Sequence, residues 1–219
     1  MESVYTEEHI DIFRDPARII VAGFSNSGKT VLVTKLVKKY SNKFSKIFIC
    51  GVSHHPLQND TTIVDKISVS KEIINPLEDK EPGEKTLLIL DDLYLQAMKH
   101  QTVVEAFIKG RHSDLSVILI TQNVFMKGPF ARDISLNATH FILLRMRDLG
   151  QVENLARQIY GKRKVTDVLE IYKRAVMRKT YGYILLDLSL KTPQLLQLRS
   201  NIVGEPPCEV IYSIDGDIA

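Results

Sequence analysis

The feature that most constrains the fold of this chain is a glycine-rich segment, residues 23–30, with the sequence GFSNSGKT. It matches the pattern G-x-x-x-x-G-K-[ST] of a phosphate-binding P-loop. An apolar run of strand length, residues 18–22, comes before it, and residues 31–40 after it repeat apolar side chains at helical spacing. Strand, loop and helix in this order are the setting that such a loop needs, so the sequence predicts a nucleoside triphosphate site.

The residue types in this loop each have a chemical role. Gly23 and Gly28 let the backbone turn closely enough for its N–H groups to point at phosphate oxygens. Lys29 would neutralise charge on the β- and γ-phosphates, and the Thr30 hydroxyl would ligate Mg²⁺. A glycine-rich turn without phosphate chemistry stays open as the alternative. The predicted nucleotide-binding residues are Gly23, Ser25, Asn26, Ser27, Gly28, Lys29 and Thr30.

Acidic and amide side chains follow two further apolar runs. Residues 86–90 form a continuous apolar run that ends in Asp91 and Asp92. Asp91 would hold Mg²⁺, and Asp92 would orient or deprotonate the attacking water or, alternatively, cap the following helix. Gln122, directly after the apolar run 115–121, could hydrogen-bond the γ-phosphate or the water, or be a plain loop residue. We predict Thr30 and Asp91 as metal ligands and Lys29, Asp92 and Gln122 as catalytic residues.

Apolar runs of strand length alternate with longer helical patterns, which is typical of a parallel sheet covered by helices. We predict an α/β fold of the P-loop NTPase class with a mostly parallel central sheet flanked by helices. Ligands of such folds gather at the carboxyl ends of strands, so the predicted site residues should meet at one edge. The predicted strands are residues 18–22, 46–50, 86–90, 115–121, 140–146 and 183–188, and the predicted helices are residues 31–40, 93–109, 149–160 and 166–178, with short elements and loops over 54–84.

The 219 residues are enough for one domain with a substantial core. We predict a single P-loop ATPase domain over residues 1–219, with the core motifs in 18–147 and a basic extension of helices and strand in 148–219. Residues 145–179 hold ten Lys or Arg and four Asp or Glu, a local charge of +6 in a chain whose net charge is only +3. Such a run is more often a solvated helix face, and contact with DNA is the functional alternative.

The composition does not indicate a membrane or secreted protein. No apolar run reaches about eighteen residues, and the acidic segment 1–8 lacks the features of a signal peptide. Cys50 and Cys208 are far apart and show no metal-ligand spacing, so free thiols in a reducing compartment are expected, with a single disulfide as the alternative. We expect an intracellular protein without membrane contact.

An arginine outside these motifs could supply positive charge to the transition state in a neighbouring subunit. Arg132 lies in the connection between two predicted strands, free to reach such a neighbour, and we predict it as a catalytic arginine finger acting in trans. Arg111, directly after Gly110, is the rival candidate, and either arginine could be a surface residue.

Several of these segments together resemble a known family. The extra apolar strand that ends in Gln122 looks like the additional-strand (ASCE) branch of P-loop ATPases. The segments that narrow the resemblance are residues 110–123 (GRHSDLSVILITQN), 132–137 (RDISLN), 147–148 (RD) and 181–187 (YGYILLD). They resemble the FtsK/HerA-type genome-packaging ATPases of poxviruses, virophages and Polinton (Maverick) or adintovirus-like elements, over roughly residues 18–201.

The resemblance implies an ATP-driven motor, a homo-oligomeric ring at a capsid or portal vertex that translocates double-stranded DNA into a preformed shell. It implies Gln122 as the sensor residue and Arg132 as the finger. A location inside a host cell, in the nucleus or a viral factory, and association with the virion are implied as well. Many family members carry Glu after the first Walker B acid. Asp92 stands there in this chain, so the sequence departs from the family pattern by a shorter carboxylate at this position.

Three other functions stay open at this point. A nucleoside or polynucleotide kinase would use the same phosphate cradle, with residues 157–164 as an arginine-bearing lid, but no acceptor site is recognisable. A nucleotide-dependent scaffold would bind without turnover, and a DNA-pumping ATPase with another task would share the motor core. GTP is disfavoured because residues 42–45, NKFS, place Ser45 where an aspartate that reads guanine is needed.

Overall fold

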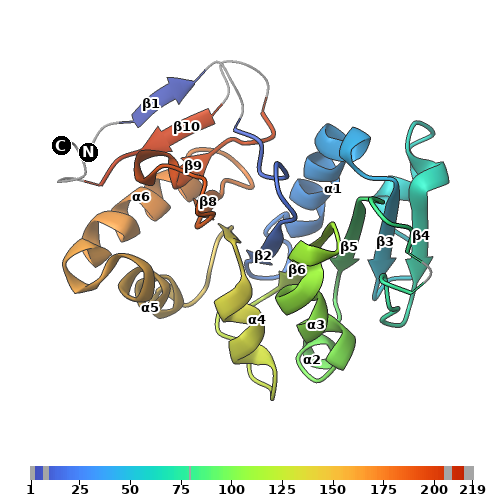
Figure 1. Ribbon diagram of the computed structural model, residues 1–219. Coiled ribbons are helices and arrows are strands. Elements are labelled where there is room, and N and C mark those ends of the chain that lie inside the picture. Colours follow the sequence, from blue (N-terminus) through green and yellow to red (C-terminus); the bar gives the residue numbers. More distant parts are fainter. Residues whose placement is uncertain (1–2, 7–9, 79, 205–208, 215–219) are drawn as a thin grey trace.

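A ten-stranded mixed sheet forms the centre of the computed structural model, which describes residues 3–6, 10–78, 80–204 and 209–214 (Figure 1). Its strand order is β1-β10-β9-β8-β7-β2-β6-β5-β3-β4. The strands from β7 to β4 run parallel, and those from β8 to β1 are antiparallel to their neighbours. The predicted α/β fold with a mostly parallel central sheet is confirmed. The strands are β1 Ser3–Thr6, β2 Arg18–Ala22, β3 Lys46–Cys50, β4 Ile67–Ser70, β5 Thr86–Leu90, β6 Leu115–Thr121, β7 His140–Leu143, β8 Ile184–Asp187, β9 Leu198–Ser200 and β10 Glu209–Tyr212.

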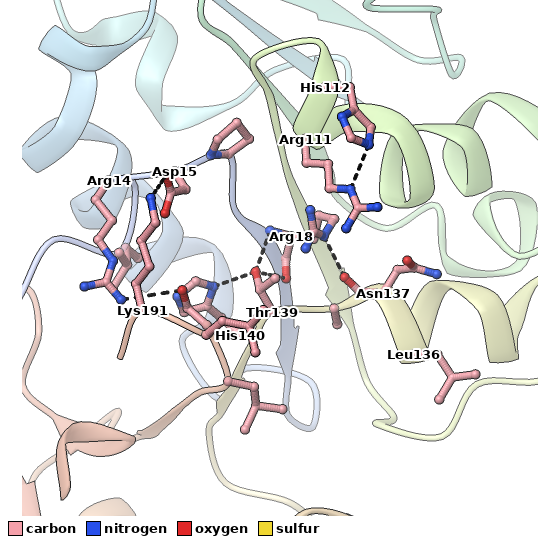
Figure 2. Close-up of a pocket in the computed structure, with 16 residues that line it drawn as sticks. Arg14, Asp15, Arg18, Arg111, His112, Leu136, Asn137, Thr139, His140 and Lys191 are labelled. Atoms are coloured by element: carbon pink, nitrogen blue, oxygen red, sulfur yellow. Dashed lines mark hydrogen bonds and ion pairs between the residues drawn. The ribbon is translucent and has the colours of Figure 1, made fainter. Parts of the chain in front are cut away.

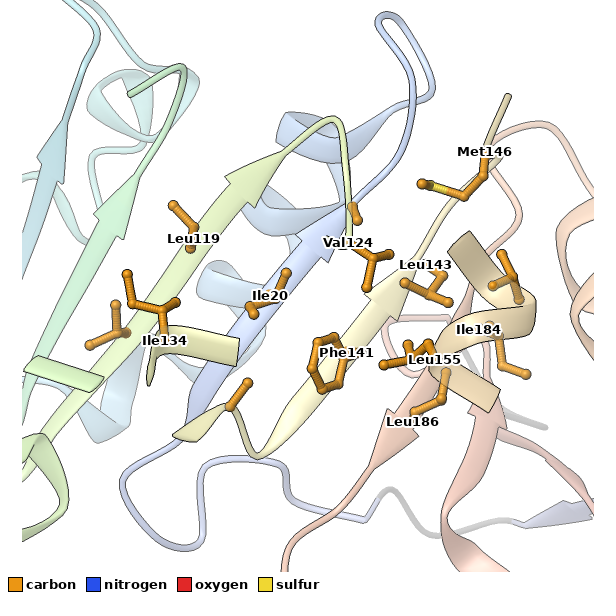
Figure 3. Packing of buried hydrophobic residues seen from close by; sticks show 14 of the residues in the cluster. Ile20, Leu119, Val124, Ile134, Phe141, Leu143, Met146, Leu155, Ile184 and Leu186 are labelled. Atoms are coloured by element: carbon orange, nitrogen blue, oxygen red, sulfur yellow. The ribbon is translucent and has the colours of Figure 1, made fainter. Parts of the chain in front are cut away.

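Helices cover both faces of the sheet because its central strands bury apolar side chains on both sides. Ile19 and Ile89 point to the face covered by α1. Ile20 and Leu119 point to the opposite face, where α2 to α6 contribute to one continuous core (Figure 3). The helices are α1 Lys29–Tyr40, α2 Tyr94–Ala97, α3 Gln101–Lys109, α4 Ala131–Asn137, α5 Leu149–Tyr160 and α6 Val165–Met177.

Some predicted elements differ from the observed ones, and tertiary contacts explain the differences. The helix predicted over residues 93–109 is broken between α2 and α3. The carbonyl of Met98 accepts a hydrogen bond from the backbone of Phe130 at 3.2 Å, and His100 is extended with φ −94° and ψ 121°. The strand predicted to reach Met146 ends earlier because the Met146 N–H donates to the Tyr172 hydroxyl at 2.8 Å. The sequence patterns also missed α4, the edge strand β4 and the strands β1, β9 and β10.

A buried ionic network joins the antiparallel strands to the parallel core. Arg199 on β9 is 0% exposed, and its guanidinium lies 2.9 Å from Asp187 on β8 and 3.2 Å from Glu209 on β10. His140 at the start of β7 lies 3.3 Å from the other oxygen of Asp187. Burial acts to raise the pKa of Asp187, but the hydrogen bond and charge of His140 and the charge of Arg199 outweigh it and lower this pKa to about 2.

Two expectations from the composition concern membrane contact and thiols. Within the described ranges, no helix combines the length and the apolarity that spanning a membrane requires. Cys50 is a buried free thiol. Cys208 lies outside the described residues.

Candidate functional site

Six of the residues predicted to act on phosphate line one cleft of about 620 Å³, whereas Gly23, Asn26, Ser27 and Gly28 of the predicted loop are not part of its lining. The cleft opens at the carboxyl ends of β2, β5 and β6, which are parallel neighbours, so the polar residues that follow these strands share one edge of the sheet. Val52, Tyr94 and Gln96, which the sequence did not single out, complete part of the lining. The predicted residues in the lining are Ser25, Lys29, Thr30, Asp91, Asp92 and Gln122.

The P-loop has no room for side chains at its two glycines. A Cβ on Gly23 would lie 2.6 Å from the Ser27 hydroxyl oxygen, and one on Gly28 would lie 2.6 Å from the ring of Tyr181. Gly28 also has a φ of +96°, a conformation that glycine adopts without steric cost. Immediately afterwards α1 begins, so the free N–H groups of its first turn and the positive end of its dipole face the loop.

Lys29 braces the loop from inside. Its ammonium group donates hydrogen bonds to the carbonyl oxygens of Gly23 at 2.8 Å and Phe24 at 3.0 Å. Burial lowers the pKa of Lys29, and the charges of Asp91 and Asp92 oppose that shift. The arrangement keeps a cation at the floor of the cleft, where phosphate oxygens would take the place of the carbonyl partners.

Thr30 and Asp91 form a pair of adjacent oxygen ligands. The Thr30 hydroxyl donates to an Asp91 carboxylate oxygen at 3.1 Å, and Asp91 is 8% exposed. Burial raises the pKa of Asp91, and the hydrogen bond from Thr30 partly offsets this. A hydroxyl and a carboxylate fit Mg²⁺, which takes few protein oxygens beside phosphates and water. No cluster of three or more His, Cys, Asp or Glu that could hold a metal occurs in the described part of the chain.

Asp92 turns the chain out of β5 into the cleft. It has a φ of 59°, in the left-handed region that Asp tolerates better than most residues. The next helix, α2, begins two residues later, and Leu93, the residue before it, makes no side-chain cap. The geometry therefore gives no support to helix capping as the role of Asp92, and its exposed carboxylate lines the cleft beside Asp91.

Gln122 projects into the cleft from a turn that is held on both sides. The Gln151 side chain of α5 donates to the Asn123 side chain at 3.0 Å and accepts from the Val124 backbone at 2.8 Å. The Thr121 hydroxyl contacts the Asn123 backbone as well. This bracing limits the positions that the Gln122 amide can take. Gln151 had no recognisable signal in the sequence because its partners are distant along the chain.

His55 lies in the segment predicted to form short elements and loops, and the structure buries it to 1% exposure. Its Nδ1 accepts from the Leu57 backbone at 3.2 Å, while Nε2 is buried without a hydrogen-bond partner. Burial lowers the pKa of His55, and the negative charge of Asp91 opposes this shift. His55 is therefore close enough to the Asp91 carboxylate to interact with it, a placement that only the tertiary structure reveals.

The two candidate finger arginines lie outside this cleft. Arg132 is exposed on the first turn of α4, and Arg111 is exposed in the short turn before β6. Neither belongs to the cleft lining, in which the described residues include no arginine. Either side chain can therefore act on phosphate only at another molecule or at another surface of this one.

A second cavity, of about 640 Å³, lies near the amino ends of β2, β6 and β7 (Figure 2). We call it the basic groove; its charged or ionisable lining residues are Arg14, Asp15, Arg18, Arg111, His112, His140 and Lys191. Asp15, the only acid among them, is paired with Lys191 at 2.8 Å. Arg18 and Arg111 lie side by side, and burial together with the charge of Arg111 lowers the pKa of Arg18.

Residues 54–194 match the model of a family described as Poxvirus A32 protein. The chain belongs to the poxvirus A32 protein family. The matched segment begins after the P-loop and contains Asp91, Asp92, Gln122 and Arg132. Membership in the A32 family agrees with the resemblance to genome-packaging ATPases, which is confirmed.

Curated relatives of this A32 family member are proteins named DNA packaging protein OPG160. The Variola virus protein is 24% identical over 178 residues, which cover 74% of this chain and 64% of the relative. The Monkeypox virus protein is 26% identical over 178 residues, covering 74% of this chain and 58% of the relative. The chain thus spans about three fifths of the length of these relatives.

Solved structures show the same fold at low identity. The genome packaging NTPase B204 from Sulfolobus turreted icosahedral virus 2, in complex with ATP-gammaS, has a TM-score of 0.56 at 20% identity, covering 81% of this chain and 94% of B204. The pCW3 conjugation coupling protein TcpA in its monomer form with ATPgS has a TM-score of 0.51 at 12% identity, covering 86% of this chain and 63% of TcpA. The additional-strand P-loop fold expected for this A32 family member is confirmed.

Proposed function

We propose that this chain is an ATP-hydrolysing motor that translocates double-stranded DNA into a preformed capsid. The observation that carries the proposal is the convergence of the P-loop pair Lys29 and Thr30 with Asp91, Asp92 and Gln122 in one cleft. Membership in a family whose curated relatives are named DNA packaging proteins supports DNA packaging as the work to which hydrolysis would be coupled.

The residues of the cleft would divide the hydrolytic reaction among them. Lys29 and the N–H groups of the loop would bind the β- and γ-phosphates, and Thr30 and Asp91 would hold Mg²⁺. When bound, this cation neutralises charge that develops on the phosphate oxygens. Gln122 would orient a water for attack on the γ-phosphorus, and the Asp92 carboxylate would accept the proton of that water as the bond to the leaving ADP breaks.

Arg132 would act on the nucleotide of a neighbouring subunit in a ring. Its exposure on α4 and its absence from the lining of its own cleft support a role in trans. A guanidinium delivered by a neighbour would stabilise charge in the transition state only when subunits are assembled, which would couple hydrolysis around the ring. The homo-oligomeric ring, the capsid or portal-vertex partner and the location in an infected host cell or virion are part of this proposal.

The basic groove is the surface that we assign to DNA. Arg18 and Arg111 lie side by side, so their like charges repel each other in the free protein, and an anion between them would relieve that repulsion. Exposed Arg14 and Lys191 extend the same positive charge along the groove. Phosphodiester groups are the anions that a DNA motor meets at regular spacing. The basic run 145–179 is the competing surface.

The test is phosphate release from ATP with and without long double-stranded DNA. The proteins are the wild type, Asp92→Asn, Asp92→Glu and the exposed control Asp65→Asn. Strong stimulation by DNA that is lost in Asp92→Asn, retained in the control and restored by Asp92→Glu supports a translocating motor with a catalytic carboxylate at this position. Turnover indifferent to DNA contradicts the motor, and a phosphorylated acceptor in place of free phosphate would identify a kinase.

A further inference from the structure

A third cavity, of about 370 Å³, lies against the P-loop and is lined by Asn26 and Ser27 of that loop. Arg145, two residues after the end of β7, Met177, the last residue of α6, and Tyr181, in the turn between α6 and β8, form other parts of its wall. The loop therefore borders two cavities, the phosphate cleft and this one. The cleft holds the polar residues suited to phosphate hydrolysis, whereas the third cavity combines an aromatic ring, apolar side chains and a guanidinium.

The shape of a nucleotide relates these two cavities, if the P-loop binds a triphosphate as proposed above. Asp91 and Gln122 mark the end of the cleft where the γ-phosphate would lie. The triphosphate follows the loop and the start of α1, so the ribose and base must leave at the opposite end of the chain of phosphates. On that side the loop is bordered by the segment after β7, where the Arg145 carbonyl accepts a hydrogen bond from the Phe24 N–H at 3.0 Å, and by residues 177–182, where the Tyr181 ring lies against Gly28.

Tyr181 is held in an unusual conformation at this place. It has a φ of 62°, and the other non-glycine residues with positive φ in the described ranges are all Asn or Asp. A bulky side chain in the left-handed region persists only where its surroundings hold it there. The ring rests directly on Gly28, and Gly182 behind it approaches the carbonyl of Val176 so closely that a Cβ would lie 2.4 Å away. Gly28 and Gly182 thus leave the space in which Tyr181 packs against the P-loop.

The ring of Tyr181 is nevertheless not part of the hydrophobic core. Tyr181 is 54% exposed and the adjacent Met177 is 77% exposed, although both side chains present apolar surface. Arg145 adds an exposed guanidinium at the same cavity. Aromatic rings and guanidinium planes are the groups on which nucleobases stack. The described lining contains no Asp or Glu, so no carboxylate is present to accept hydrogen bonds from the edge of guanine.

We propose that this cavity is the nucleobase subsite of the ATP site, in which Tyr181 stacks on the adenine and Met177 and Arg145 cover it. The inference rests on the proposed nucleotide site and assigns residues 177–182, the end of α6 and the turn after it, a part in binding that the P-loop motif does not contain. In this arrangement Gly28 contacts the Tyr181 ring on one side and would approach the phosphates on the other, because it has no side chain.

Equilibrium binding of Mg-ATP and of Mg-tripolyphosphate tests the subsite, because tripolyphosphate has the phosphates without the base. Tyr181→Asn removes the ring with a residue that accepts the left-handed backbone, Tyr181→Phe keeps the ring, and Leu195→Ala is a control on the surface. Tyr181→Asn should bind ATP about tenfold more weakly than the wild type, because the ring on which the base stacks is gone. The ATP affinity of Tyr181→Phe and the tripolyphosphate affinities of both variants should stay within about twofold of wild type.

Equal loss of ATP and tripolyphosphate affinity in Tyr181→Asn would overturn the subsite, since the ring would then only support the loop. Unchanged ATP affinity would overturn it as well. Thermal unfolding checks the fold of each variant, and Met177→Ala, at the exposed helix end, should shift ATP affinity in the same direction if Tyr181→Asn does not fold. The assay contains no DNA, so its failure leaves the motor proposal standing, and loss of DNA stimulation leaves the subsite standing.

Discussion

The Thr30 hydroxyl donates a hydrogen bond to the Asp91 carboxylate across 3.1 Å, which joins the first turn of α1 to the end of β5. These two residues are far apart in the sequence and come from separate motifs. Their contact places two hard oxygen ligands side by side at the floor of the cleft, and it also gives the buried Asp91 carboxylate a hydrogen-bond donor. Burial of the Asp91 carboxylate lowers the stability of the fold, and the proposed role of this carboxylate is to bind Mg²⁺.

Replacing Asp91 by Asn should therefore separate stability from function. Burial raises the folded-state pKa of Asp91. The stability contributed by such a group is fully present below the unfolded carboxyl pKa of about 4 and is lost as the pH rises through the raised folded pKa. At pH 7, Asp91→Asn should unfold at the same temperature as the wild type or higher, with the difference shrinking toward pH 4.

The same variant should lose Mg²⁺-dependent nucleotide binding, which titration with and without Mg²⁺ measures. Asp65→Asn, at an exposed position, is the matched control for charge. A clear fall in the unfolding temperature of Asp91→Asn at pH 7 would show that the carboxylate stabilises the fold instead.

Arg132 should complement a defective P-loop in mixed assemblies. Lys29→Ala should lose hydrolysis with the fold retained, because the cation that binds the phosphates is gone. Arg132→Ala subunits should also be inactive alone. Mixing the two should restore part of the phosphate release, since an intact cleft from one variant meets an intact finger from the other. No recovery at any ratio would contradict a finger at Arg132, and the same experiment with Arg111→Ala tests its rival.

Arg111→Gln should weaken binding of double-stranded DNA without changing affinity for ATP. Each lost phosphate contact lowers the slope of log affinity against log salt by about one, and the loss should be similar for every DNA sequence. Fluorescence anisotropy over a salt series measures both quantities. The double variant Lys162→Gln and Arg163→Gln, in the competing basic run, is the control. If the control loses more slope than Arg111→Gln, DNA contacts the 145–179 run and not the basic groove.

Arg199→Met should destabilise the protein strongly. It removes the cation from a buried network and leaves Asp187 and Glu209 without this ion pair, a change that costs about 3–5 kcal/mol at comparable sites. Denaturant unfolding at pH 7 measures the loss, and Arg199→Lys should recover part of it.

Acid should weaken the same network in the wild type. The folded-state pKa of Asp187 is lowered to about 2, so the stability that it contributes is present above the unfolded value of about 4 and is lost as the pH falls from 4 to 2. Arg199→Met should show a smaller loss over this interval. An equal acid dependence of both proteins would mean that the network does not control it.

The predictable part of the site follows from two local rules. The spacing of Gly23, Gly28 and Lys29 already predicts a loop that wraps around phosphate, because this pattern between a strand and a helix is typical of phosphate-binding loops. Asp91 and Gln122 could be assigned to the same edge because parallel strands end together. The structure brings both into the cleft. Their catalytic roles stay predictions that the experiments above test.

Other parts of the structure had no local signal. The strands β9 and β10 have three and four residues, too few for periodicity to show, and the ion pairs of Arg199 with Asp187 and Glu209 form only when β8, β9 and β10 lie side by side. His55 looks like any polar loop residue until the chain buries it near Asp91. Tyr181 carries no sign in the sequence that it packs on Gly28.

The sequence by itself determined the P-loop, the polar motifs that follow the parallel strands and the resemblance to a family, because these depend on residue types at short spacing. Only the tertiary structure decided which surfaces the remaining groups form. The partnership of Thr30 with Asp91, the basic groove and the placement of Tyr181 beside the P-loop each join segments distant along the chain. Their positions result from the packing of helices onto a twisted sheet, which no local pattern records.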